Sequence, residues 1–136
     1  MPRILSTALV CVALAFGGAA CTVPGLVRAP GGPGWRCPDV VEAARRTGWP
    51  DDRLAWVDRI AWRESRCRPD AWSPTRDAGA MQIHHRWIGW ELCRLGIACH
   101  VTQLFELDVN LRAAAHIYAV QGPNAWAANR ARRGDS

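Results

Sequence analysis

The sequence predicts a mostly α-helical single domain with a small loop or hairpin between its helices. Its 136 residues, of which 49% are hydrophobic and 21% charged, give room for one globular domain and a short leader. Apolar residues recur at helical spacing in several segments, and no run of residues alternates as successive β-strands would. Each helical segment is also bordered by the Pro, Asp or Gly residues that commonly begin and end helices.

The N-terminal residues have the pattern of an export signal. Arg3 precedes the apolar stretch ILSTALVCVALAF, and the small residues of GGAAC follow. Cleavage after Ala20 would make residues 1–20 a signal peptide. GAAC also resembles a bacterial lipobox, in which Cys21 becomes the lipidated first residue. We therefore expect an exported protein, extracellular or in the cell envelope, that contacts a membrane only if Cys21 carries lipid.

A flexible linker and a set of cysteines follow the leader. Residues 21–36 are rich in Gly and Pro, which predicts a linker, and the globular domain is expected to span residues 37–136. Four cysteines lie in this domain, and exported cysteines are usually oxidised. Of the three possible pairings we favour Cys37–Cys67 and Cys93–Cys99. The alternative is a metal site, but the His and Cys spacing fits no standard zinc pattern, so we expect no metal and no cofactor.

Two helices are predicted in the first half of the domain. The segment PDVVEAARRTG places Pro38 in a first helical turn and Gly48 at a helix end. The next segment begins at Pro50-Asp51-Asp52, where an Asp side chain can cap the helix, and it continues to about Cys67.

Glu64 occupies an unusual position on this second helix. With residues 53–66 placed at about 100° per residue, Glu64 falls in the middle of the apolar arc formed by Leu54, Trp56, Val57, Ile60 and Ala61. Arg59, Arg63 and Arg66 are predicted to lie on the opposite side. Burial and the negative end of the helix dipole both favour a protonated carboxyl group, as a general acid requires. The alternative is that the helix frays and Glu64 simply pairs with an arginine.

The second half of the domain predicts a loop and two further helices. SPTRDAGAMQIH breaks the helical pattern and indicates the loop or small hairpin. RWIGWELCRLG predicts a short helix that ends at Gly96. Asp108 is expected to cap a last long helix, VNLRAAAHIYAVQ, which Gly122-Pro123 ends.

Four short motifs occur in order along the domain: Glu64-Ser65 at a helix end, Ser73, GAMQ at residues 79–82, and Asn110-Leu111 at the start of the last helix. Together they resemble the motifs of the soluble lytic transglycosylases, the goose-type-lysozyme-like branch of the lysozyme superfamily. The resemblance covers roughly residues 37–126. Ala80 stands where the family usually has Leu, Ala114 replaces a Gly, and Tyr118 is one place late.

The resemblance implies a lysozyme-like domain that cleaves the β-1,4 bond between N-acetylmuramic acid and N-acetylglucosamine in peptidoglycan. Glu64 would protonate the leaving oxygen and then act as base on the C6 hydroxyl of the muramic residue, which closes a 1,6-anhydro ring. One carboxylate suffices because the sugar supplies the nucleophile, whereas hydrolysis usually needs two. Hydrolysis by a lysozyme-type mechanism is the close alternative, with Asp70 or Asp77 as the second carboxylate. A non-catalytic peptidoglycan-binding module is a further alternative.

The resemblance also implies a set of substrate-binding residues: Ser65, Ser73, Met81, Gln82, Asn110 and Tyr118. For each of them, packing or turn formation is the alternative role. Four tryptophans are candidate stacking platforms between which the sequence does not choose: Trp72, Trp87, Trp90 and Trp126. The histidines His84, His85 and His116 are expected to have only surface or packing roles.

The net charge of the chain indicates the kind of partner that it binds. All 17 basic residues are arginine and the formal net charge is +5, which suits an anionic partner. An exported chain without a nucleic-acid motif meets cell-wall polymer first. We therefore expect the partner to be peptidoglycan glycan strands rather than nucleic acid, and we expect the protein to be a monomer.

Overall fold

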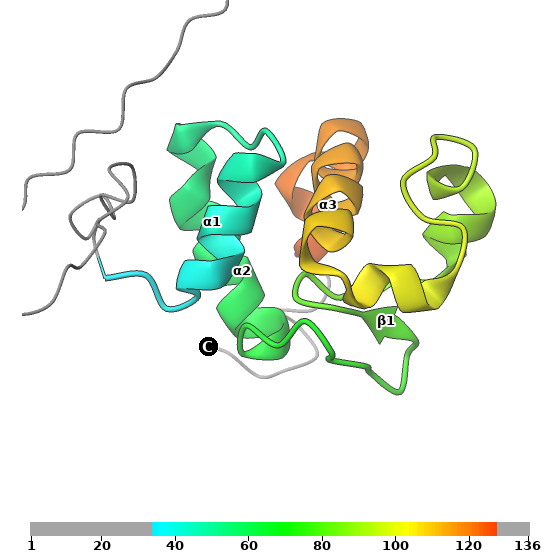
Figure 1. Ribbon diagram of the computed structural model, residues 1–136, viewed down its shortest axis with the longest axis horizontal. Helices are drawn as coiled ribbons and strands as arrows, with labels where there is room; N and C mark the ends of the chain where they lie inside the picture. Colours follow the sequence, from blue (N-terminus) through cyan, green and yellow to red (C-terminus); the bar gives the residue numbers. More distant parts are fainter. Residues whose placement is uncertain (1–33, 128–136) are drawn as a thin grey trace, which may run out of the picture. The chain divides into compact units, whose positions relative to one another are not determined.

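The computed structural model describes residues 34–127, and this part of the chain is mostly helical (Figure 1). Its α-helices are α1 (Pro38–Arg46), α2 (Leu54–Ser65) and α3 (Leu107–Gln121). Shorter elements accompany them: η1 (Asp51–Arg53), β1 (Asp77–Ala78), β2 (Ile83–His84), η2 (Ile88–Leu92), η3 (Val101–Phe105) and η4 (Gly122–Trp126). The mostly α prediction and the predicted hairpin are confirmed. The predicted signal peptide, Cys21 and the linker up to residue 33 lie outside the described residues.

The first helix begins and ends as its sequence predicts. Pro38 lies in the first turn of α1, where a missing backbone N–H costs no helical hydrogen bond. After the last turn, the Thr47 hydroxyl donates to the carbonyls of Ala43 and Ala44 at 2.8 and 3.1 Å. Gly48 then adopts a φ of 88°, a conformation that glycine reaches without strain.

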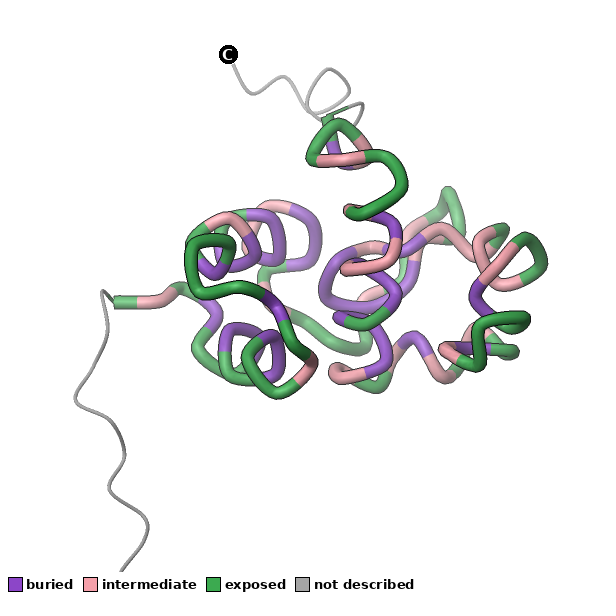
Figure 2. The backbone as a smooth tube through the Cα atoms, turned by 90° about the horizontal axis from the view of Figure 1, so that it is seen from above, coloured by how far each residue is buried: buried purple, intermediate pink, exposed green. Residues whose placement is uncertain are grey.

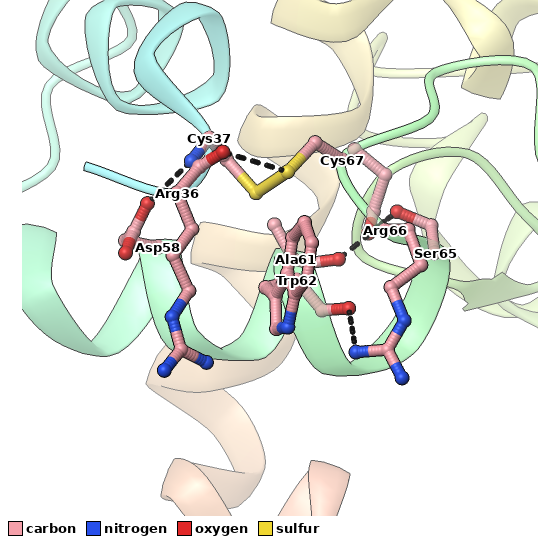
Figure 3. The surroundings of a disulfide bond; sticks show 9 residues. Arg36, Cys37, Asp58, Ala61, Trp62, Ser65, Arg66 and Cys67 are labelled. Carbon is pink, nitrogen blue, oxygen red and sulfur yellow. Dashed lines mark hydrogen bonds between the residues drawn. A yellow bond between two sulfur atoms is a disulfide. The ribbon is translucent and has the colours of Figure 1, made fainter.

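The second helix is preceded by a 3-10 turn and ends in an unusual conformation. Pro50 is the N-cap residue of η1, and neither aspartate of that turn makes the predicted side-chain cap. At the other end, Arg66 and Cys67 both have positive φ values, 56° and 66°. The Cys67 N–H bonds the carbonyl of Ala61 at 3.2 Å, and its sulfur is bonded to Cys37 (Figure 3). The disulfide and this hydrogen bond together hold the chain in a left-handed turn that non-glycine residues rarely adopt.

The surroundings of this disulfide join the first two helices. The Cys37 N–H donates to the buried carboxylate of Asp58 on α2 at 2.7 Å (Figure 3). The guanidinium carbons of Arg36 and Arg66 lie 5.8 and 4.9 Å from the ring centroid of Trp62. These cation–π contacts cover the outer side of α2 next to the disulfide.

The third helix begins differently from the prediction. Glu106 is its N-cap residue, no side chain caps it, and Asp108 lies within its first turn. There Asp108 accepts a 2.8 Å hydrogen bond from Arg46, so that it connects α1 to α3 instead of capping the helix. Gly122 ends α3 with a φ of 68°, as predicted. The segment predicted as a short helix before Gly96 is a single π-helical turn, η2.

The three α-helices and the hairpin share one hydrophobic core. In two views, α3 lies between the α1–α2 pair and the loop that carries η2, and buried stretches of the helices face one another (Figures 1 and 2). The largest enclosed apolar side chains come from nearly every element: Val40, Val41, Leu54, Val57, Met81, Ile83, Leu92, Leu104 and Leu111. Because Met81 and Ile83 belong to the hairpin, this core fixes the hairpin against the helices.

Both favoured disulfides, Cys37–Cys67 and Cys93–Cys99, are present and confirm the predicted pairing. Disulfides indicate maturation in an oxidising environment such as that of exported proteins. None of the helices within residues 34–127 has the length and apolar character of a membrane span.

We predict that the two disulfides contribute unequally to stability. The Cys37–Cys67 bond closes a loop of 30 residues and the Cys93–Cys99 bond a loop of 6. Closing a longer loop removes more entropy from the unfolded chain. Replacing both cysteines of a pair by alanine should therefore lower the free energy of unfolding by about 3–4 kcal/mol for the first pair and by about 2 kcal/mol for the second. Urea unfolding of the two double variants measures the difference. Equal costs, or the opposite order, would contradict this account.

Candidate functional site

Glu64 lies in the last turn of α2 and is enclosed. None of its side-chain surface is exposed, and its Oε1 accepts hydrogen bonds from Nε and Nη2 of Arg63 at 3.0 and 2.7 Å. The same Nη2 donates to the backbone carbonyl of Trp126 in η4 at 2.6 Å. The sequence placed Arg63 on the opposite side of the helix. Its long side chain instead folds back along the helix, and its guanidinium joins Glu64 to η4.

The turn of the hairpin, residues 79–82, is held by side chains from three other elements. Ser65, at the end of α2, donates its hydroxyl to the Ala80 carbonyl at 2.8 Å. Asn110, on α3, accepts from the Met81 N–H at 2.8 Å and donates to the carbonyls of Ala78 and Leu104 at 3.0 and 2.8 Å. From η4, the indole N–H of Trp126 donates to the Met81 carbonyl at 2.9 Å.

This arrangement revises three of the predicted substrate contacts. Met81 and Asn110 have no exposed surface, and Ser65 is 8% exposed. The Ser65 hydroxyl and the Asn110 amide are occupied by backbone groups of the hairpin and its neighbours, and the Met81 side chain belongs to the core. In this structure they position the hairpin, which is the alternative role that the sequence allowed.

The remaining hairpin residues brace its strands or face a cleft. The Ser73 hydroxyl donates to Oδ2 of Asp77 at 2.8 Å and accepts from the Asp77 N–H at 3.0 Å. Gln82 has a φ of 50° and donates its side-chain amide to the Gly79 carbonyl at 2.9 Å. Ser73 therefore supports the first strand, whereas Gln82 and Asp77 also line the cleft described below.

Tyr118 packs in an aromatic cluster between α2 and α3. Its ring lies 5.6 Å from that of Trp49 and 4.9 Å from that of Trp56, in both cases edge-on. The ring of Trp56 also lies 5.2 Å from that of Trp126, whose carbonyl accepts a hydrogen bond from Arg63. The ring of Tyr118 therefore packs with tryptophans, which is the alternative role that the sequence allowed.

A cleft of about 370 Å³ lies between the hairpin, α3 and η4. Its lining residues are Thr75, Asp77, Gln82, Ile83, His84, Arg86, Trp87, Ile117, Gln121, Ala125 and Trp126. Trp126 also borders a second hollow of about 320 Å³, to which Arg59 and Arg63 contribute. Glu64 is connected to both hollows through Arg63 and Trp126, but it lines neither as the structure stands.

The two candidate second carboxylates differ in position. Asp70 is exposed, and the guanidinium of Arg68, 3.2 Å from its Oδ1, lowers the pKa of this carboxyl and makes it a weaker base. Asp77 lines the cleft and accepts hydrogen bonds from the hydroxyls of Ser73 and Thr75. Of the two, only Asp77 lines the cleft.

Sequence reasoning missed Arg63 and the specific place of Trp126. A single tryptophan gives no signal of what its backbone carbonyl will bind, and an arginine next to Glu64 in sequence is expected on a different face.

Within the described range, no group of three or more His, Cys, Asp or Glu residues is arranged to hold a metal ion. Compared with known protein families, curated proteins and solved structures, the chain matches none.

We predict that Gly79→Ala is much more destabilising than Gly48→Ala. Both glycines have positive φ values, 76° and 88°, so both substitutions introduce backbone strain. A Cβ at residue 79 would also overlap the Asn110 amide and the Leu104 carbonyl, whereas one at residue 48 meets nothing within 4 Å. We expect losses of roughly 3–5 and 1–2 kcal/mol in chemical unfolding. Similar losses would show that the hairpin turn tolerates displacement of Asn110.

Proposed function

We propose that this chain is a peptidoglycan lytic transglycosylase with a lysozyme-like fold, in which Glu64 is the catalytic acid and base. One observation carries the proposal. Glu64 is buried at the C-terminal end of α2, and the next residue, Ser65, bonds the turn of a hairpin that forms one wall of a cleft. A buried carboxyl group whose neighbour in sequence fixes the wall of a cleft suits a reaction in which one residue is both acid and base and the substrate supplies the nucleophile.

The proposed reaction balances without water. The Glu64 carboxyl gives its proton to the glycosidic oxygen, and the bond from C1 of the muramic residue to that oxygen breaks. The C6 hydroxyl of the same sugar then attacks C1, and its proton returns to the carboxylate of Glu64. For this to occur, the Arg63 guanidinium and Trp126 must shift, because together they enclose Glu64 in the present arrangement.

The cleft offers groups of the kind that bind amino sugars. Gln82, Asp77 and His84 bring polar atoms to the hairpin wall, and Trp87 brings aromatic surface. Sugar hydroxyls and N-acetyl groups need hydrogen-bond partners, while the C–H faces of pyranose rings pack on aromatic side chains. This mixture supports a saccharide as the occupant.

Hydrolysis remains the second candidate reaction because Asp77 lies in the cleft. A lysozyme-type mechanism needs a second carboxylate across the scissile bond, and Asp77 is better placed for it than the exposed Asp70. Its oxygen Oδ2 accepts hydrogen bonds from two hydroxyl groups, which hold the carboxylate in a fixed position.

A non-catalytic binding module is the third candidate. It is favoured by the enclosure of Glu64, whose side chain is ion-paired with Arg63 and has no exposed surface. In that case the cleft would hold glycan strands, and the ion pair would be a structural element that fastens α2 to η4.

We predict that Glu64→Gln lowers the rate of peptidoglycan cleavage roughly 10²–10⁴-fold while cell-wall binding is retained. Glutamine keeps an oxygen that can accept from Arg63 but cannot transfer the proton. Glu42→Gln is the matched control, because Glu42 is 71% exposed on α1 and its loss changes the net charge equally. Release of soluble fragments from purified peptidoglycan measures both variants. A Glu64→Gln rate close to wild type would remove Glu64 from the mechanism.

We predict that the released fragments end in 1,6-anhydromuramic acid. Mass spectrometry distinguishes them, because an anhydro end is lighter than a hydrolysed end by one water. In heavy-oxygen water, the anhydro products should carry no label, since the attacking oxygen belongs to the sugar. Labelled reducing ends would establish hydrolysis and direct attention to Asp77. Binding without any fragments would favour the non-catalytic module.

A further inference from the structure

The tryptophans that the sequence could not rank differ clearly in their surroundings. Trp126 is 4% exposed and holds the hairpin turn, while Trp72 is 51% exposed and packs edge-on against Phe105. Trp87 lines the cleft, and the ring of Trp90 lies 5.8 Å from that of Trp87 at an angle of 70°. Trp90 is 64% exposed, which is the largest exposed fraction among the large hydrophobic residues of the described range.

Trp90 is exposed although its backbone is firmly fixed. It lies in η2, whose Leu92 is fully buried, and the Cys93–Cys99 disulfide closes the loop directly after it. Glu91, its neighbour in sequence, has its Oε2 2.7 Å from Nε2 of His116 on α3. This hydrogen bond lowers the pKa of Glu91 and thus favours the charged form that keeps η2 attached to α3.

An exposed indole on a fixed backbone beside a polar cleft offers a flat face for stacking. Exposed apolar surface that adjoins a cleft is typical of a binding site, whereas a single exposed apolar residue elsewhere needs no explanation. Trp87 provides that continuity, because it contributes to the cleft wall and contacts Trp90. Arg86, also in the wall, adds positive charge that suits the carboxylates carried by peptidoglycan stems.

We propose that Trp87 and Trp90 form an additional saccharide subsite, which continues the cleft and stacks a pyranose ring of a β-1,4-linked amino-sugar strand on the exposed indole of Trp90. This inference rests on the proposed function, since it assumes that the cleft holds a glycan. The subsite adds a contact with Trp90 outside the cleft. Long glycan strands reach this contact, whereas short strands do not. The flat indole face packs against the axial C–H groups of the sugar, and the hydroxyls remain in water.

The test compares binding of N-acetylglucosamine oligomers of increasing length, from the disaccharide to the hexasaccharide, by calorimetry. Trp90→Ala should weaken binding of the longest oligomers roughly 3- to 10-fold and leave the disaccharide unaffected. Trp90→Phe should restore most of the affinity, because it keeps an aromatic face. Leu95→Ala is the control, since Leu95 is another exposed apolar residue, 43% exposed, in the disulfide-closed loop that follows Trp90. A thermal melt verifies that each variant is folded.

The outcomes separate this inference from the proposed function. Wild-type binding that Trp90→Ala leaves unchanged at every length would overturn the subsite alone. A loss that is equal for the disaccharide and the hexasaccharide would also overturn it, because Trp90 would then act within the cleft. If wild type binds neither oligomers nor peptidoglycan and releases no fragments, both proposals fail. A concentration-dependent dimer in sedimentation that disappears in Trp90→Ala would identify the indole as a self-association surface and overturn the subsite.

Discussion

The buried amide of Asn110 is the interaction on which the rest of the site depends. It makes three hydrogen bonds to backbone groups of two other segments, and a buried polar side chain without partners would be costly. The amide fits there only because Gly79 has no Cβ. Asn110 thereby fixes the hairpin turn against α3 and η3. Ser65 and Trp126 then bond a turn that is already in place, and the cleft wall follows from that position.

The helices were predictable because local chemistry determines their ends. Pro38, Gly48 and Gly122 act through backbone constraints that do not depend on the rest of the fold, and the structure has them where the sequence indicated. Asp108 was assigned a cap because aspartate favours that position, but α3 begins two residues earlier, with Glu106 as its N-cap residue, and the Asp108 carboxylate bonds Arg46. The pairing of the cysteines was also predicted. By contrast, a short helix was predicted where the chain forms the π-helical turn of η2, which directly precedes the disulfide-closed loop of residues 93–99.

The residues of the candidate site could be named from the sequence, but the roles of several of them could not. The position of Glu64 on the apolar stripe followed from helical periodicity, and its burial agrees with that reasoning. The roles of Met81, Asn110 and Tyr118 were not recoverable, because a motif specifies residue types and says nothing of exposure. Met81 and Asn110 are buried and help to build the hairpin turn, and Tyr118 packs in an aromatic cluster. The fold-back of Arg63 depends on the carbonyl of Trp126, which is 63 residues away in the sequence.

Trp126 is the residue that connects the cleft with the ion pair of Arg63 and Glu64. Its side chain lines the cleft, its indole N–H holds the hairpin turn, and its carbonyl bonds the guanidinium that holds Glu64. Under the proposed function, an occupant of the cleft touches a residue that must move before Glu64 can reach a glycosidic bond. A ligand shifts such an equilibrium only by its difference in affinity for the closed and open arrangements. Enzyme and binding module would thus differ in one property, namely whether glycan binding favours the arrangement in which η4 has moved away from Arg63.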